Sequence, residues 1–130
     1  MPASFDLIAE TVAALPIAAK MEGMWRSMRH LSRTPLSGAH AVLFLAMYGR
    51  VRLSRDVPTF DLAELAREVG VTGAAVAIFI DDLEALDLVL TDGRTKLRSA
   101  IRATLPCLLA DCDAVAQMRT EWEPKVCTLH

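Results

Sequence analysis

Apolar residues near the start of the chain recur every three or four positions, which is the spacing of one helix face. The pattern is clearest over residues 17–31, where arginines occupy the opposite side. After a break, residues 39–50 are apolar almost without interruption, which predicts a helix buried on most sides. The apolar stripe over 17–31 contains Met21, Met24, Trp25 and Met28.

Two short helices are predicted between residues 61 and 85. Asp61 can cap a helix over 62–69 by accepting from free backbone N–H groups, and Glu64 can complete a capping box. Gly70 suits a left-handed position at the helix end, and Thr72 can cap the next helix. Two short helices joined by a glycine and a few residues are typical of a helix-turn-helix. The core face of the second helix contains Val76, Phe79, Ile80 and Leu83.

After Asp87 the apolar period changes from three or four residues to two, which predicts a β-hairpin. Asp92 and Gly93 form a pair favoured in two-residue turns. Thr91 should therefore lie opposite Arg94, with Lys96 pointing outward.

These elements predict a single domain over residues 1–130, mostly α with a small β-hairpin wing. A winged helix-turn-helix core over 38–103 is flanked by N-terminal helices (1–33) and a C-terminal helix (104–122), with a tail at 123–130. A chain of 130 residues is long enough for one hydrophobic core.

The formal net charge is -2, but basic and acidic residues are distributed unevenly along the chain. Residues 20–55 contain seven basic residues and one acid, whereas residues 56–92 contain nine acids and one basic residue. Residues 93–105 contain four basic residues and no acid. A basic hairpin can contact phosphates, although a solvated hairpin would show the same composition.

The chain shows no apolar run of the roughly 18 residues needed to span a bilayer, and acids precede any basic residue at its start. We therefore expect a cytoplasmic protein without membrane contact. The three cysteines, Cys107, Cys112 and Cys127, are an odd number near the C-terminus, which favours reduced thiols. On a helix the first two would face directions about 140° apart, so no metal or other cofactor is expected.

The segment Asp61-Leu-Ala-Glu-Leu-Ala-Arg-Glu-Val-Gly-Val-Thr resembles the winged helix-turn-helix of bacterial transcription regulators. The segment Asp82-Leu-Glu-Ala-Leu-Asp-Leu-Val and the Asp92-Gly93 turn resemble the same regulators. Among them, the sequence is most similar to the MarR-like group and more distantly similar to the Rrf2-like group. Asp87 departs from the usual glycine, but aspartate tolerates a left-handed backbone. The resemblance covers about half the chain and implies DNA binding by a dimer that is joined through helices outside the winged core. The implied DNA-binding positions are Arg94, Lys96 and Arg98 in the wing and Thr72, Gly73, Ala74, Ala75, Ala77 and Ile78 in the recognition helix.

Base edges are read mainly by Arg, Lys, Asn and Gln, and the implied recognition positions contain none of these. Asp81 and Asp82 would also repel phosphates. The first hypothesis is therefore a dimeric transcriptional regulator that contacts the DNA backbone. The alternative is a protein–protein interaction module that has lost DNA reading. The expected dimer interface comprises Met21, Met24, Trp25, Met28, Leu105, Leu108, Leu109 and Trp122.

No phosphate loop, dinucleotide fingerprint, zinc-protease motif or nucleophile elbow occurs in the sequence. We therefore expect that the protein is not an enzyme.

Overall fold

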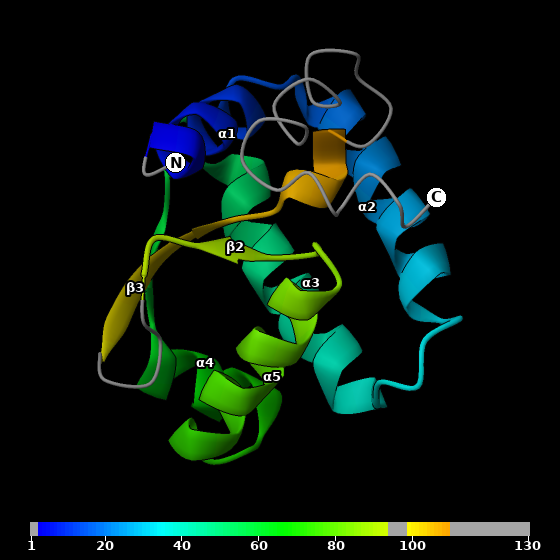
Figure 1. Cartoon of the computed structure of the whole chain (residues 1–130), viewed down its shortest axis with the longest axis vertical. Coiled ribbons are helices and arrows are strands. Elements are labelled where there is room, and N and C mark those ends of the chain that lie inside the picture. The colour runs from blue at the N-terminus through cyan, green and yellow to red at the C-terminus, as the bar shows by residue number, and fades with distance from the viewer. Residues whose placement is uncertain (1–2, 94–98, 110–130) are drawn as a thin grey trace.

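A computed structural model describes residues 3–93 and 99–109 of the chain. The fold is mostly helical, with a small antiparallel sheet (Figure 1). The elements in chain order are α1 (Ala3–Ala13), α2 (Ile17–Leu31), α3 (Gly38–Leu53), β1 (Thr59–Asp61), α4 (Leu62–Val69), α5 (Gly73–Ala85), β2 (Leu90–Thr91), β3 (Ala100–Thr104) and the 3₁₀ helix η1 (Pro106–Leu109).

Helix α3 runs through the middle of the molecule and packs against α2, α4 and α5 (Figure 1). Its buried side chains include Leu43, Phe44 and Met47, which are fully enclosed. The near-continuous apolar sequence predicted burial on most sides, but Val42, Leu45 and Leu53 are 47%, 41% and 71% exposed, so part of the apolar surface of α3 faces solvent.

The sheet has the strand order β1-β3-β2, with both pairs antiparallel. Phe60 on β1 lies opposite Ile101 on β3, and both side chains are fully buried. This apolar pair joins the strand that precedes α4 to the second strand of the hairpin.

The predicted hairpin register is wrong. Thr91 pairs with Ala103, and the N–H of Asp92 donates to the carbonyl of Arg102 at 3.0 Å, so Thr91 does not lie opposite Arg94. The connection between β2 and β3 is therefore longer than a two-residue turn at Asp92-Gly93. In the observed register Ile101 and Ala103 of β3 are both fully buried.

Helix α2 buries the side that carries its small residues and leaves part of the predicted dimer interface at the surface. Its buried residues are Lys20, Gly23, Ser27 and Leu31, whereas Met21 and Trp25 are exposed and Met24 and Met28 are half-buried. The cause is the close approach of η1, because a Cβ on Gly23 would lie only 2.8 Å from the Cα of Leu108. Only a face of small residues allows this contact.

The C-terminal part of the predicted dimer interface needs correction. Leu105, Leu108 and Leu109 are buried in the core of the single chain, so they are not surface residues that could join two copies. They pack inside because η1 turns the chain back onto α1 and α2. Trp122 lies outside the described residues.

Of the segment predicted as a C-terminal helix, 104–122, the structure describes residues 104–109. Thr104 belongs to β3, where it pairs with Leu90, and the helical turn at 106–109 is of the 3₁₀ type. Strand pairing holds this backbone in an extended form, and Pro106 then begins the short helix, where its missing N–H costs nothing. Residues 110–122 lie outside the described part.

Lys20 is buried on α2 and joins this helix to the end of α3. Its Nζ donates to the carbonyl oxygens of Val51 at 3.1 Å and Ser54 at 3.3 Å. These carbonyls belong to the last turn of α3, where backbone acceptors have no partner within the helix and a positive charge is favourable. Burial lowers the pKa of Lys20 from its ordinary value.

Candidate nucleic-acid interface

The connection between α4 and α5 has the geometry that the sequence predicted. The Asp61 carboxylate accepts from the N–H groups of Ala63 at 2.9 Å and Glu64 at 3.2 Å. Gly70 ends α4 in the left-handed conformation at φ 83°, and Thr72 caps α5 by accepting from the N–H of Ala75 at 3.1 Å. Short polar side chains therefore fix the start of each helix, and Gly70 fixes the end of α4.

The reciprocal half of the predicted capping box is replaced by a contact between helices. The Glu64 carboxylate accepts from Arg50 of α3 at 3.0 Å, and Glu68 accepts from the same guanidinium at 2.7 Å. Arg50 also lies over the ring of Phe60, 5.7 Å from its centroid. Arg50, one of the seven basic residues between positions 20 and 55, is therefore paired with acidic side chains within the fold.

The outward side of α5 carries the predicted recognition positions. Val76, Ile80 and Leu83 are buried, which leaves Ile78 on the outer side with 55% of its surface exposed, as the helical register requires. Gly73 and Ala74 are exposed near the N-terminus of α5, and the other positions implied as DNA-binding are Thr72, which is exposed, and Ala75 and Ala77, which are half-buried. This outer surface is small and apolar.

A polar cluster that the sequence analysis did not identify fixes α5 against α3. The backbone N–H of Ser37 donates to Nδ1 of His40 at 3.1 Å, and Nε2 of His40 lies 2.9 Å from the carboxylate of Asp82. Because Nδ1 accepts, the proton of the neutral ring is on Nε2, from which it is donated to Asp82. The spacing of Ser37 and His40 matches a capping box, a local signal that could have identified this half of the cluster but not its contact with Asp82.

This cluster changes the role expected for Asp82. Its side chain remains 43% exposed, but one oxygen is directed to the buried His40 ring. The His40 ring also contacts Phe79, with a centroid separation of 4.3 Å. The carboxylate is therefore partly engaged within the fold, but it keeps its negative charge because the ring that donates to it is neutral.

Glu84 joins α5 to the base of the hairpin. Its carboxylate accepts from the backbone N–H and from the hydroxyl of Thr91, both at 3.2 Å. Burial raises the pKa of Glu84, and the hydrogen bonds from Thr91 oppose this effect without cancelling it. The backbone at Asp87 is left-handed at φ 61°, so aspartate does occupy the conformation for which glycine is usual.

The wing residues Arg94, Lys96 and Arg98 lie outside the described residues. Their flanking strands are described, so the base of the hairpin is positioned beside α5 by Glu84 and Thr91. Of the other basic side chains, Arg29 and Arg33 are exposed. Arg26 lies near Glu22 at 3.9 Å.

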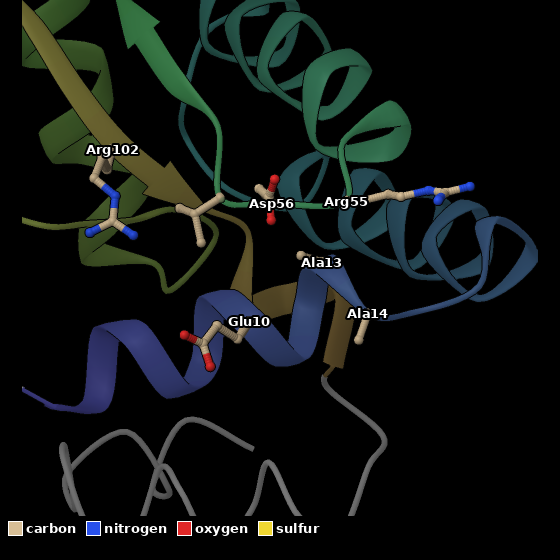
Figure 2. A pocket seen from close by; sticks show the side chains of 7 residues that line it. Glu10, Ala13, Ala14, Arg55, Asp56 and Arg102 are labelled. Atoms are coloured by element: carbon tan, nitrogen blue, oxygen red, sulfur yellow. The ribbon is translucent and has the colours of Figure 1, made fainter.

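A cleft of about 280 Å³ lies on the side of the molecule formed by α1, β3 and the segment after α3 (Figure 2). Figure 2 shows the Arg55 side chain directed away from it. Arg102 is held by Asp6 at 3.5 Å and lies over the ring of Phe5. The lining is Glu10, Ala13, Ala14, Arg55, Asp56, Val57 and Arg102, and because both signs of charge are present the cleft favours neither anions nor cations.

Cys107 is buried, and its thiol donates to the carbonyl of Leu88 at 3.4 Å. Cys112 and Cys127 lie outside the described residues. Within residues 3–93 and 99–109, no three histidine, cysteine or acidic side chains are grouped as metal ligands. In the same part of the chain, no helix has the length and apolar character needed to cross a membrane.

Comparison with protein-family models, curated proteins and solved structures finds no match to this chain. Its function is therefore argued from the chemistry of the site.

Proposed function

We propose that this chain is a winged-helix DNA-binding protein, a transcriptional regulator that binds DNA as a dimer and mainly through the phosphate backbone. The observation that carries the proposal is the capped α4–α5 pair, with the exposed N-terminal part of α5 beside the base of a hairpin. The element order α3-β1-α4-α5-β2-β3 and the strand order β1-β3-β2 support a helix-turn-helix followed by a wing.

The N-terminus of α5 suits a phosphate. The first N–H groups of a helix lack partners within it, and the helix dipole places partial positive charge there. Gly73 and Ala74 have no bulky side chain to keep DNA away. The wing contains three basic residues, Arg94, Lys96 and Arg98, which would add positive charge at the DNA backbone.

A salt-titrated binding experiment tests this proposal. Fluorescence anisotropy with two unrelated DNA duplexes should show similar affinities that fall steeply between about 50 and 200 mM salt. The double variant Arg94→Ala, Lys96→Ala should weaken binding to both duplexes and reduce the salt slope by about two phosphate contacts. The matched control Arg33→Ala, Arg55→Ala changes the net charge equally at two exposed positions outside α5 and the wing and should bind like the wild type. Wild-type affinity in the wing variant would remove the wing from the mechanism.

A second candidate function is a winged-helix protein–protein interaction module, and the exposed Ile78 favours it. An exposed isoleucine among small side chains forms an apolar patch, and such patches mark protein contacts when they are extended. Ile78→Arg separates the candidates, because the new charge should strengthen DNA binding by the first but disrupt partner binding by the second. An unfolded Ile78→Arg variant would show that this side chain is required by the core and that the outward-facing positions assigned to α5 are wrong.

A further inference from the structure

Helix α2 presents a ladder of apolar and basic side chains to solvent. Met21 and Trp25 are 41% and 59% exposed, and they are separated by one helical turn. Arg29 follows at the same four-residue step, and Arg33 lies one step further, in the turn beyond the helix. Tryptophan, methionine and arginine are enriched at protein interfaces, and tryptophan and arginine supply many of the residues that dominate binding.

Helix α5 presents a ladder of the complementary kind. Ala74 and Ile78 are exposed at a four-residue step, and Asp82 follows at the next step with its side chain 43% exposed. The hydrogen bond from His40 fixes the Asp82 carboxylate in place, so that little conformational entropy would be lost when it meets a cation.

We propose that α2 of one copy of this chain docks along α5 of a second copy, with Trp25 against Ile78 and Arg29 against Asp82. In both helices the charged side chain follows the apolar one by four residues, a rise of about 6 Å, so a parallel arrangement aligns both pairs at once. The charge distribution agrees, since the segment containing α2 is basic and the segment containing α5 is acidic.

This arrangement names the partner for the interaction module proposed above and rests on that second candidate function. The two surfaces are different, so the contact is heterologous: in a pair, one copy retains a free α5 surface and the other retains a free α2 surface. Copies therefore add head to tail. An α5 that is covered by a neighbouring copy is unavailable to DNA, so self-association and DNA binding compete.

Sedimentation velocity over a range of protein concentrations tests the proposal, using the full chain. The wild type should increase in mass with concentration, and Trp25→Glu or Ile78→Arg should each weaken association by at least about tenfold, as expected for central interface residues. Leu7→Glu is the matched control, because Leu7 is similarly exposed on α1 and lies outside both surfaces. It should associate like the wild type.

Mixing the two defective variants gives the decisive result. Trp25→Glu retains an intact α5 surface and Ile78→Arg retains an intact α2 surface, so an equimolar mixture should form a 1:1 dimer that does not grow further. A mixture that stays monomeric, or a wild type that is monomeric at all concentrations, would overturn the proposal. Association that is lost in Trp25→Glu but kept in Ile78→Arg would instead indicate a symmetric contact between α2 helices. If Ile78→Arg associates like the wild type but binds DNA more tightly, the head-to-tail contact fails while the DNA-binding proposal stands.

Discussion

Gly23→Ala should destabilise the protein although it replaces glycine in the interior of a helix. The added Cβ would lie 2.8 Å from the Cα of Leu108, 3.0 Å from its carbonyl oxygen and 3.1 Å from its Cδ2. Two of these three atoms belong to the backbone of η1, so a side-chain rotation cannot relieve the contact. Either α2 or η1 must move, and η1 is anchored by the buried Leu105 and Leu109.

The magnitude follows from two opposing effects. Overpacking a buried contact costs about 1–3 kcal/mol, whereas replacing a helical glycine with alanine gains about 0.5–1 kcal/mol. We therefore expect Gly23→Ala to lower the free energy of unfolding by about 1–2 kcal/mol, measured by urea denaturation and followed by circular dichroism.

Gly49→Ala is the matched control, because a Cβ at this position on α3 would have no neighbour within 4 Å. This variant should gain the helical contribution alone and be more stable than the wild type by about 0.5–1 kcal/mol. The two substitutions are chemically identical and should change stability in opposite directions. Equal stabilisation by both would show that η1 does not approach α2 closely and would refute steric fit against Leu108 as the reason that α2 buries its Gly23 side.

Three further predictions concern caps and buried charges. Asp61→Ala should cost about 1 kcal/mol in urea denaturation, because two N–H groups at the start of α4 lose their acceptor; an unchanged midpoint would contradict this. Burial raises the pKa of Glu84 above its ordinary value of 4.5, so its charge opposes folding at neutral pH. The stability of the wild type relative to Glu84→Gln should therefore rise as the pH falls toward 4.5, and a pH-independent difference would show that Glu84 is not desolvated. The lowered pKa of Lys20 has the opposite consequence, so the stability of the wild type relative to Lys20→Met should rise as the pH increases toward 10.5. Thermal unfolding of both proteins at several pH values measures this stability difference, and a difference that falls with increasing pH would contradict the prediction.

Local signals in the sequence predicted the helices around the candidate interface well. Asp61, Gly70 and Thr72 act on backbone groups within three or four residues, so their effect does not depend on distant parts of the chain. The same holds for the exposure of Ile78, which follows from helical periodicity once its neighbours fill the core. These residues specified the ends of α4 and α5 and the outer side of α5.

Contacts between distant segments could not be derived in this way. His40 and Asp82 are 42 positions apart, and nothing in either local sequence indicates that α3 and α5 bring them within hydrogen-bond distance. The hairpin register is another case, because Asp92-Gly93 is locally a good turn. The pairing of β3 with β1 nevertheless selects a longer connection, since Ile101 must reach Phe60.

The ends of α4 and α5 were thus determined by the sequence alone, because hydrogen bonds and periodicity within one turn decide them. The face that α2 buries was decided only in the tertiary structure. Its methionine and tryptophan stripe is the more apolar side, yet the close approach of Leu108 requires the small side of Gly23 and Ser27 to face inward. Hydrophobicity favours burial of the stripe, but steric fit between packed backbones is the stronger constraint, and it leaves Trp25 at the surface, where it can contact another molecule.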